Sequence, residues 1–365
     1  MTTVRGFNWE PATRPQTVGG SIYVADMFCG LGGLSLGVKR FCRDAGIGVH
    51  TALAVDTDEY ATRVFDANHR PERVQTRSLL EVDYSGCAEE GIDLVMAGPP
   101  CQGHSPLNNH TRHDDPRNGL YSEAARFAAF VKAPLVLLEN VPQVVRSVSE
   151  EVDLAIRILR EAEYNVEDGV LSAAEMGWPQ SRKRHFLAAH RYVAPTPMSE
   201  VQRLMGQRPQ SVLSAFEGLP EASESCPDPL HRPSRLSKDN RERIDAIFDA
   251  GVYDCPESHR PARQVPTTTY SESYCRMRPD RPSPTITGMF RTPGTGRFIH
   301  PEERRVITHR EAARLQGFPD NYDFLDGWTR TSLATHIGNA VPVALGYAAI
   351  LSLFVGGVRS RSLFL

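Results

Sequence analysis

The sequence lacks any Cys-x-x-Cys pair, and this absence excludes the usual cysteine-based scaffolds. Its seven cysteines are an odd number, and their wide spacing argues against a disulfide framework. We therefore expect reduced thiols, which leaves a catalytic cysteine chemically feasible. The cysteines are Cys29, Cys42, Cys87, Cys101, Cys226, Cys255 and Cys275.

Export signals, long apolar spans and repeats are also missing. No early stretch joins a basic start to an apolar core, and the longest late apolar run, 341–355, is shorter than the roughly 20 residues that span a bilayer. No low-complexity tract or internal repeat interrupts the chain. We expect an intracellular, cytoplasmic protein with an ordinary globular core.

Lysine is scarce, although the chain is not poor in basic residues. Four of the 41 Lys and Arg residues are lysines, so 41 − 4 leaves 37 arginines, and the formal net charge is −3. Such a net charge does not indicate a nucleic-acid partner, but grouped arginines suit phosphate and base-edge contacts. The base composition of the genome is the alternative cause of this bias.

Apolar runs alternate with helical patterns along the first half of the chain, which predicts an α/β fold. We expect a loose leader over 1–20 and a catalytic and cofactor-binding domain over 21–190. Prolines are frequent and periodicity is weak over 191–310, and 13 arginines lie between 203 and 297, which predicts a loop-rich module with a cationic face over 191–310. The segment 311–365 contains an apolar closing helix that should return to the first domain.

The predicted site is centred on the octapeptide 98–105, Gly-Pro-Pro-Cys-Gln-Gly-His-Ser. It follows the apolar run 92–97, so Cys101 should lie just past the carboxyl end of a buried strand, where open α/β sheets carry their chemistry. The two prolines stiffen the approach to the thiol. An inert buried cysteine at a strand end is the alternative.

Two further strand ends carry polar residues. A short strand enters a glycine-rich turn at 26–33, and a second strand ends in Asp56, which suits a nucleoside-type ligand or, alternatively, a helix cap. Glu139 follows the apolar run 134–138, where desolvation should raise its pKa unless the strand end is solvated. Arg182 and Arg184 should share one face of a strand, as an anion-binding pair or as an exposed basic edge.

Six segments of this chain, in order, resemble the motifs of the C5-cytosine DNA methyltransferase family. The resemblance spans about 23–355 and implies a Rossmann-like S-adenosylmethionine-dependent methyltransferase domain with a mixed sheet, and a smaller, loop-rich target-recognition domain. The matching segments are 26–33, 98–105, 139–141, 180–184, 281–287 and 338–342.

The resemblance implies roles for the site residues. Cys101 would add to C6 of a cytosine flipped out of double-stranded DNA, and Glu139 would protonate N3, so that C5 becomes nucleophilic. Asn140, Arg182 and Arg184 would position Glu139 and the cytosine O2. S-adenosyl-L-methionine would be the methyl donor, and no metal is expected. The residues implied around the donor are Phe28, Gly30, Leu31, Gly32, Asp56, Pro100, Asn339 and Val341.

Some positions depart from the family pattern. Ser78 stands where an acid commonly contacts the adenine amino group, so Ser78 or Asp83 would take that place, and His104 replaces an aromatic residue. The residue types of Cys226, His231, Cys255, His259 and Cys275 suit zinc, but their spacings do not match tight zinc pairs, so structural cysteines are favoured.

Three other functions compete with this interpretation. An amino-methylating DNA enzyme would follow its Pro-Pro pair with an aromatic residue, whereas here Cys101 follows. A tRNA cytosine-5 methyltransferase remains an alternative, although its Cys-Phe-Thr motif is missing, and so does a silent DNA-binding homologue, although Cys101 and the glycines are intact. The expected setting is a restriction-modification or other anti-phage system, with its partner proteins.

Overall fold

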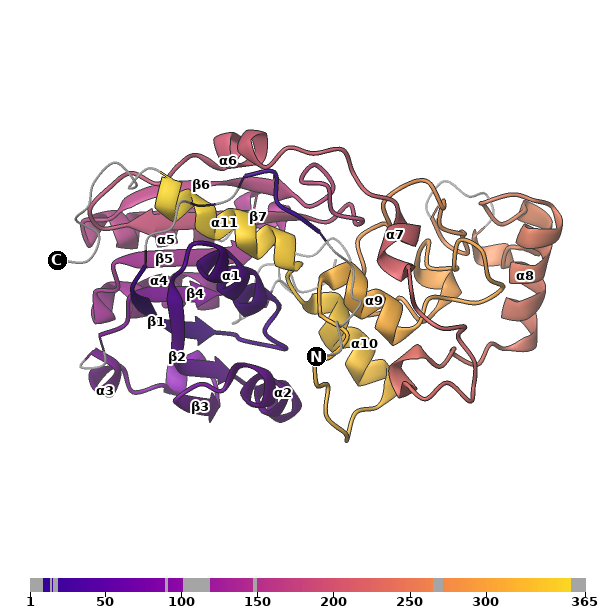
Figure 1. Cartoon of the computed structure of the whole chain (residues 1–365), viewed down its shortest axis with the longest axis horizontal. Helices are drawn as coiled ribbons and strands as arrows, with labels where there is room; N and C mark the ends of the chain where they lie inside the picture. The colour runs from indigo at the N-terminus through magenta and orange to yellow at the C-terminus, as the bar shows by residue number, and fades with distance from the viewer. Residues whose placement is uncertain are drawn as a thin grey trace. The chain divides into compact units, whose positions relative to one another are not determined.

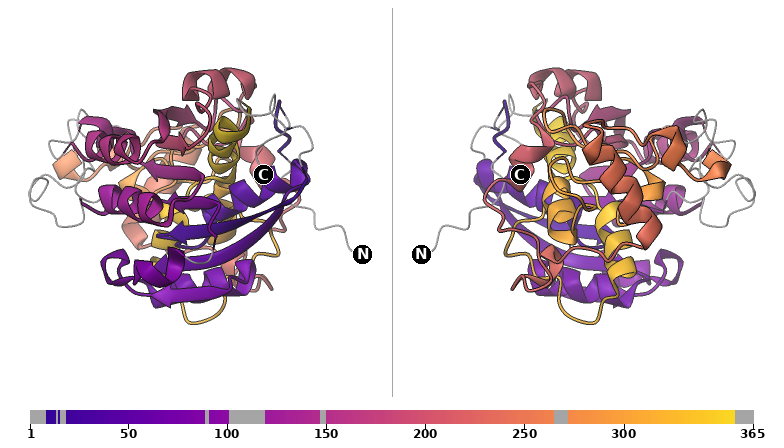
Figure 2. Two further views of the ribbon diagram at one scale, coloured as in Figure 1. Left: turned by 90° about the vertical axis from the view of Figure 1, so that its left-hand side faces the viewer. Right: turned by 90° about the vertical axis from the view of Figure 1, so that its right-hand side faces the viewer.

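The computed structural model describes residues 9–13, 15, 19–88, 91–100, 119–146, 150–264 and 272–355, which fall into two compact units. Within those residues, the sheet unit comprises 11–172, 183–207 and 341–365. The loop unit comprises 1–10, 173–182 and 208–340. Figure 1 shows the elements of both units, and Figure 2 shows them turned by 90°.

The sheet unit is built on a seven-stranded mixed sheet of order β3-β2-β1-β4-β5-β7-β6. The strands β1 to β5 are parallel, and β7 runs antiparallel to both of its neighbours. This sheet confirms the predicted α/β class. The strands are β1 Ser21–Met27, β2 Gly48–Asp56, β3 Arg73–Thr76, β4 Leu94–Ala97, β5 Leu135–Asn140, β6 Asn165–Ser172 and β7 Lys183–His190.

Helices cover both faces of this sheet. The apolar residues of α4 and α5 join the alternate strand side chains of one face in a single core, and α1, α2 and α11 cover the other face. The helices α1 and α11 pack closely, because a Cβ on Gly37 would lie 2.6 Å from the carbonyl oxygen of Val343. The helices are α1 Gly33–Asp44, α2 Glu59–His69, α3 Tyr84–Ala88, α4 Leu120–Val131, α5 Glu151–Glu161, α6 Met198–Leu204 and α11 Val343–Val355, with 3-10 turns η1 Leu79–Glu81 and η3 Pro142–Arg146.

One segment of the described chain, Arg330–Phe354, is long and apolar enough to cross a membrane. However, 89% of its most apolar window is buried inside the protein, as expected for the core helix of a globular fold.

The loop unit has little regular structure in its described residues. Its longer segments are held together by buried side chains and by close backbone approaches such as that of Gly288 to Thr335. The helices are α7 Val212–Phe216, α8 Lys238–Asp249, α9 His309–Gln316 and α10 Arg330–Asn339, with 3-10 turns η4 Pro229–His231, η5 Glu257–His259, η6 Ala262–Gln264 and η7 Pro293–Thr295.

The unit boundaries differ from the predicted 190 and 310. The sheet unit continues to 207 because α6 packs on β6, where the backbone N–H of Ser172 donates to the Gln202 side chain at 2.8 Å. The segment 173–182 joins the loop unit, where the Trp178 indole donates to the carbonyl of Leu315 at 2.7 Å. The return to the sheet unit begins only at 341. Periodicity along the chain does not report such side-chain contacts.

Candidate active site

The carboxyl ends of β4 and β5 lie side by side, and they bring the Gly-Pro-Pro stem against Glu139 and Asn140. A Cβ on Gly98 would lie 3.3 Å from Oε2 of Glu139, and the Asn140 amide nitrogen lies 3.5 Å from the carbonyl oxygen of Pro99. The stem continues through the half-buried Pro100. Cys101 itself, like His104, lies outside the described residues.

Glu139 is a buried carboxyl with a cationic partner. Its side chain is 8% exposed, and the Arg184 Nε lies 2.8 Å from its Oε1. The side chain is therefore buried at the end of β5, which rules out the alternative of a solvated strand end. Next to it, Asn140 is 2% exposed, and its Oδ1 accepts the backbone N–H of Val141 at 2.8 Å. That bond orients the amide so that its nitrogen faces the stem.

Arg182 has different contacts from Arg184, although the sequence predicted one shared face. The strand β7 begins at Lys183, so the two-residue alternation does not extend to Arg182. Arg182 belongs to the loop unit, is 2% exposed, and donates to the carbonyls of Ile286 and Gly338 at 2.7 and 2.9 Å. It therefore joins two segments of the loop unit, and its role at a cytosine remains a prediction.

Replacing Arg182 with methionine should destabilise the protein by about 3 kcal/mol. The change would remove two short charge-assisted hydrogen bonds worth about 1.5 kcal/mol each, and it would leave the Gly338 carbonyl only a longer bond from Gln316 Nε2 at 3.3 Å. Urea unfolding measures the loss, with the exposed neighbour Lys183→Met as the control. A loss no larger than that of the control would show that these bonds do not stabilise the loop unit.

The glycine-rich turn forms a cradle at the carboxyl ends of β1 and β2. Phe28, Gly30 and Gly32 all have positive φ, and a Cβ on Gly30 would meet nothing within 4 Å. Asp56 ends β2, and its Oδ2 accepts the Gly30 N–H at 2.9 Å. Leu31 is buried behind the turn. The turn thus leaves open space beside a carboxylate that can also accept ligand hydroxyls.

Side-chain contacts settle one sequence alternative. The cap of α2 is Asp58, whose Oδ1 accepts the Ala61 N–H at 2.9 Å, so Asp56 is not the helix cap. The choice between Ser78 and Asp83 as the adenine contact stays a prediction. Ser78 caps η1, where its Oγ accepts the Leu80 N–H at 3.3 Å. Asp83 lies in a turn and accepts from Ser85.

The remaining predicted residues fall in both units. Asn339 is exposed at the end of α10 in the loop unit, and Val341 is buried in the sheet unit. Their contribution to a donor pocket stays a prediction.

Two buried groups beside these sites were not predicted from the sequence. Asp26 precedes the glycine-rich turn, is buried, and accepts from Ser35 Oγ at 2.7 Å. Burial raises its pKa to about 7. Tyr121 on α4 is fully buried, and burial, followed by the charges of Asp168 and Glu139, raises the pKa of its phenol. Asp26 could have been noticed in the sequence because it is a charged residue next to an apolar run. The sequence of α4 contains no pattern that would single out Tyr121.

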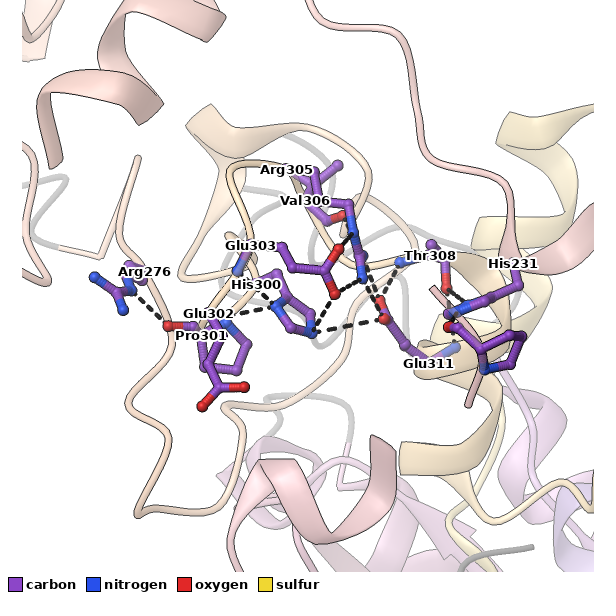
Figure 3. Close-up of polar contacts among 11 residues, drawn as sticks. His231, Arg276, His300, Pro301, Glu302, Glu303, Arg305, Val306, Thr308 and Glu311 are labelled. Carbon is purple, nitrogen blue, oxygen red and sulfur yellow. Dashed lines mark hydrogen bonds and ion pairs between the residues drawn. The ribbon is translucent and has the colours of Figure 1, made fainter. Parts of the chain in front are cut away.

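The loop unit contains a cluster of His300, Glu303 and Glu311, whose polar groups have hydrogen-bond or ion-pair partners within the protein (Figure 3). The His300 Nδ1 accepts the backbone N–H groups of Glu302 and Glu303 at 3.1 and 3.0 Å, so the neutral ring has no lone pair left for a metal ion. Burial lowers the pKa of His300 to about 4, which keeps the ring neutral. Arg305 pairs with both oxygens of Glu311 at 2.7 and 2.8 Å, so the cluster secures the start of α9.

The five residues that suited zinc have other contacts. The ring nitrogens of His231 face Thr308 and the carbonyl of Pro220 at 3.0 and 2.8 Å (Figure 3). The three cysteines of the loop unit are buried, and none of them is in a disulfide within the described residues. Within the described residues, Cys226, His231, Cys255, His259 and Cys275 do not gather into a three-ligand group.

Comparison of the chain with known proteins identifies the family to which it belongs. The family model for the C-5 cytosine-specific DNA methylase matches residues 22–354. The type II methyltransferase M1.BsuMI of Bacillus subtilis is 36% identical over 346 residues, covering 91% of this chain and 80% of that protein. The type II methylase M.HgiDII of Herpetosiphon aurantiacus is 31% identical over 355 residues, covering 93% and 97%.

Solved structures share the fold. A putative DNA modification methyltransferase encoded within a prophage of E. coli has a TM-score of 0.63 at 24% identity, covering 93% of this chain and all of that one. The Dnmt2 methyltransferase of S. pombe has a TM-score of 0.60 at 18% identity, also covering 93% and 100%. With the family match over nearly the whole chain, these findings show that the protein belongs to the C-5 cytosine-specific DNA methylases and is a DNA (cytosine-5)-methyltransferase.

Proposed function

We propose that this methyltransferase activates cytosine through a covalent bond between the Cys101 sulfur and C6 of the base. C5 of cytosine does not attack a methyl donor until electron density is pushed into the ring. Addition of the thiolate at C6, with a proton delivered to N3, makes C5 part of an enamine. When C5 has gained its methyl group, N3 returns its proton, a base removes the C5 proton, and the thiolate leaves from C6 as the C5–C6 double bond re-forms.

Glu139 is the proposed proton donor to N3. The observation that carries the proposal is the position of the Gly-Pro-Pro stem, whose Gly98 lies against the Glu139 carboxyl. Cys101 is three residues further along the sequence, and we propose that its thiol and the Glu139 carboxyl act on one base. Arg184 holds Glu139 in place, and Asn140 holds the stem through Pro99.

S-adenosylmethionine, the donor that the family implies, supplies the methyl group when bound. The cradle at Gly30 and the carboxylate of Asp56 suit its amino-acid and ribose parts, because the turn has open space and Asp56 accepts hydroxyl hydrogens. We assign Phe28 to the adenine, with Leu31, Gly32, Pro100, Asn339 and Val341 completing the pocket. The glycine-rich turn needs no lysine, since this donor has no phosphates.

The substrate is proposed to be double-stranded DNA from which the cytosine is flipped, at a cost of a few kcal/mol in lost stacking. We assign the biological role to self-marking in a cytoplasmic restriction-modification system, since similar proteins are named type II methyltransferases. The loop unit, rich in arginine, would recognise the target.

Bisulfite sequencing of DNA from a host that expresses the protein tests the function directly. We expect protected cytosines at one recurrent sequence, and none in a host that expresses the Cys101→Ser variant. Protected cytosines in tRNA alone would instead assign the protein to the RNA-directed alternative.

A further inference from the structure

Two arginines of the loop unit lie together without an acidic partner among the described residues. Arg291 donates from Nε to Ser234 Oγ and from Nη1 to Thr331 Oγ1, both at 3.2 Å. Arg330 donates from Nη1 to the carbonyls of Arg232 and of the following proline, at 3.0 and 3.3 Å. All of these acceptors are neutral, so neither positive charge is compensated.

Five other arginines of the loop unit are neutralised by carboxylates, whereas this pair has no carboxylate partner in the part of the chain that the structure describes. Arg304, for example, is paired with Asp245 and Asp249. Four more have carboxylate partners: Arg297 with Asp254 and Glu272, Arg305 with Glu303 and Glu311, Arg310 with Asp228, and Arg314 with Asp320.

The two guanidinium groups are close enough to repel each other. Burial lowers the pKa of Arg291, and the charge of Arg330 lowers it further. The adjacent His309 adds no third positive charge near pH 7, because burial lowers its pKa to about 4. Two like charges held together at a half-buried site are unfavourable unless an anion joins them.

The first turn of α10 adds to the positive potential. Thr329 caps this ten-residue helix, Arg330 is its first residue, and no acidic residue occupies the first turn. The amino terminus of a helix favours anions through its unpaired N–H groups and its dipole. Thr329 and Thr331 are exposed, so this end of the helix is open to a ligand.

We propose that Arg291 and Arg330, together with the first turn of α10, bind one phosphate of the DNA backbone. The planar donor fork of arginine matches phosphate oxygens, and two forks that converge from separate segments fix its position. The partly buried site, held by Ser234 and Thr331, is preorganised, so it would set the register of the duplex on the loop unit. This inference rests on DNA being the substrate, as proposed above.

The salt dependence of DNA binding tests the assignment. The full-length double variant R291Q/R330Q, which removes both charges but keeps amide donors, is titrated against a fluorescein-labelled duplex from about 50 to 200 mM salt. Loss of one phosphate contact should weaken binding and reduce the slope of log K against log salt by about 0.9. R304A is the matched control and should keep the wild-type slope, because its charge is already paired.

An unchanged slope and affinity in R291Q/R330Q would overturn the inference. If that variant does not fold, the single variants R291K and R291Q are compared: R291K keeps the positive charge and should bind DNA more tightly than R291Q, and equal binding by the two would also overturn the inference. Calorimetric titration with inorganic phosphate alone distinguishes a free-anion site, since saturation by phosphate with no change in DNA affinity would reject the DNA assignment. Wild-type protein that binds DNA through this pair but protects no cytosine would contradict the proposed function alone.

Discussion

The Cys101→Ser variant is expected to transfer no measurable methyl groups while it still binds DNA. A serine hydroxyl is a far weaker nucleophile than a thiolate toward C6, and removal of an essential nucleophile lowers rates on the order of 10⁴-fold or more. Transfer of labelled methyl groups to duplex DNA measures the rate, and a mobility shift measures the binding. The buried Cys87→Ser variant is the control, since Cys87 lies in the core of the sheet unit.

Trapping of the adduct gives an independent check on Cys101. A duplex that contains 5-fluorocytosine at the target should form a complex with the wild-type protein that survives denaturation, because fluorine cannot leave C5 as a proton. The serine variant should form none. Full activity in that variant, or failure of the wild type to trap the fluorinated base with the donor present, would remove covalent addition from the mechanism.

The Glu139→Gln variant is expected to lose about 10²- to 10⁴-fold in the rate of methyl transfer, the usual contribution of a general acid. Glutamine has nearly the same shape but carries no acidic proton, and it replaces the ion pair with Arg184 by a weaker neutral contact. Single-turnover kinetics separates this loss from changes in DNA affinity.

A second glutamate provides the matched control for Glu139. Glu200 also pairs with an arginine, and its Oε2 accepts from Arg203 Nε at 2.7 Å, but this pair is on the exposed surface of α6. Glu200→Gln should leave the rate unchanged. Equal rates for the two variants would mean that the proton on N3 comes from another group.

Much of the sheet unit was predictable because burial on both faces leaves a direct record in the sequence. All residues of β4 and β5 are buried, and both strands appear in the chain as apolar runs. Parallel pairing then makes their carboxyl ends neighbours, which explains why the Gly-Pro-Pro stem and Glu139 could be expected to meet. The glycine-rich turn and Asp56 follow from the same rule for β1 and β2.

The two arginines of the 180–184 segment show where sequence reasoning stops. They are two residues apart, yet Arg184 pairs with Glu139 in the sheet unit and Arg182 joins backbone segments of the loop unit. Strand alternation could not separate them, because the strand begins between them. The contacts of Arg182 come from Ile286 and Gly338, more than 100 positions away.

The sequence by itself determined the α/β class, the family and the order of the reactive residues, since these depend on local periodicity and short motifs. Only the tertiary structure decided that the cluster around His300 is structural, that the unit boundaries fall at 207 and 340, and that Arg291 and Arg330 have no acidic partner among the residues that the structure describes. The physical reason is that charge pairing and burial depend on distances across the fold, and the chain brings those residues together from segments that show no pattern of their own.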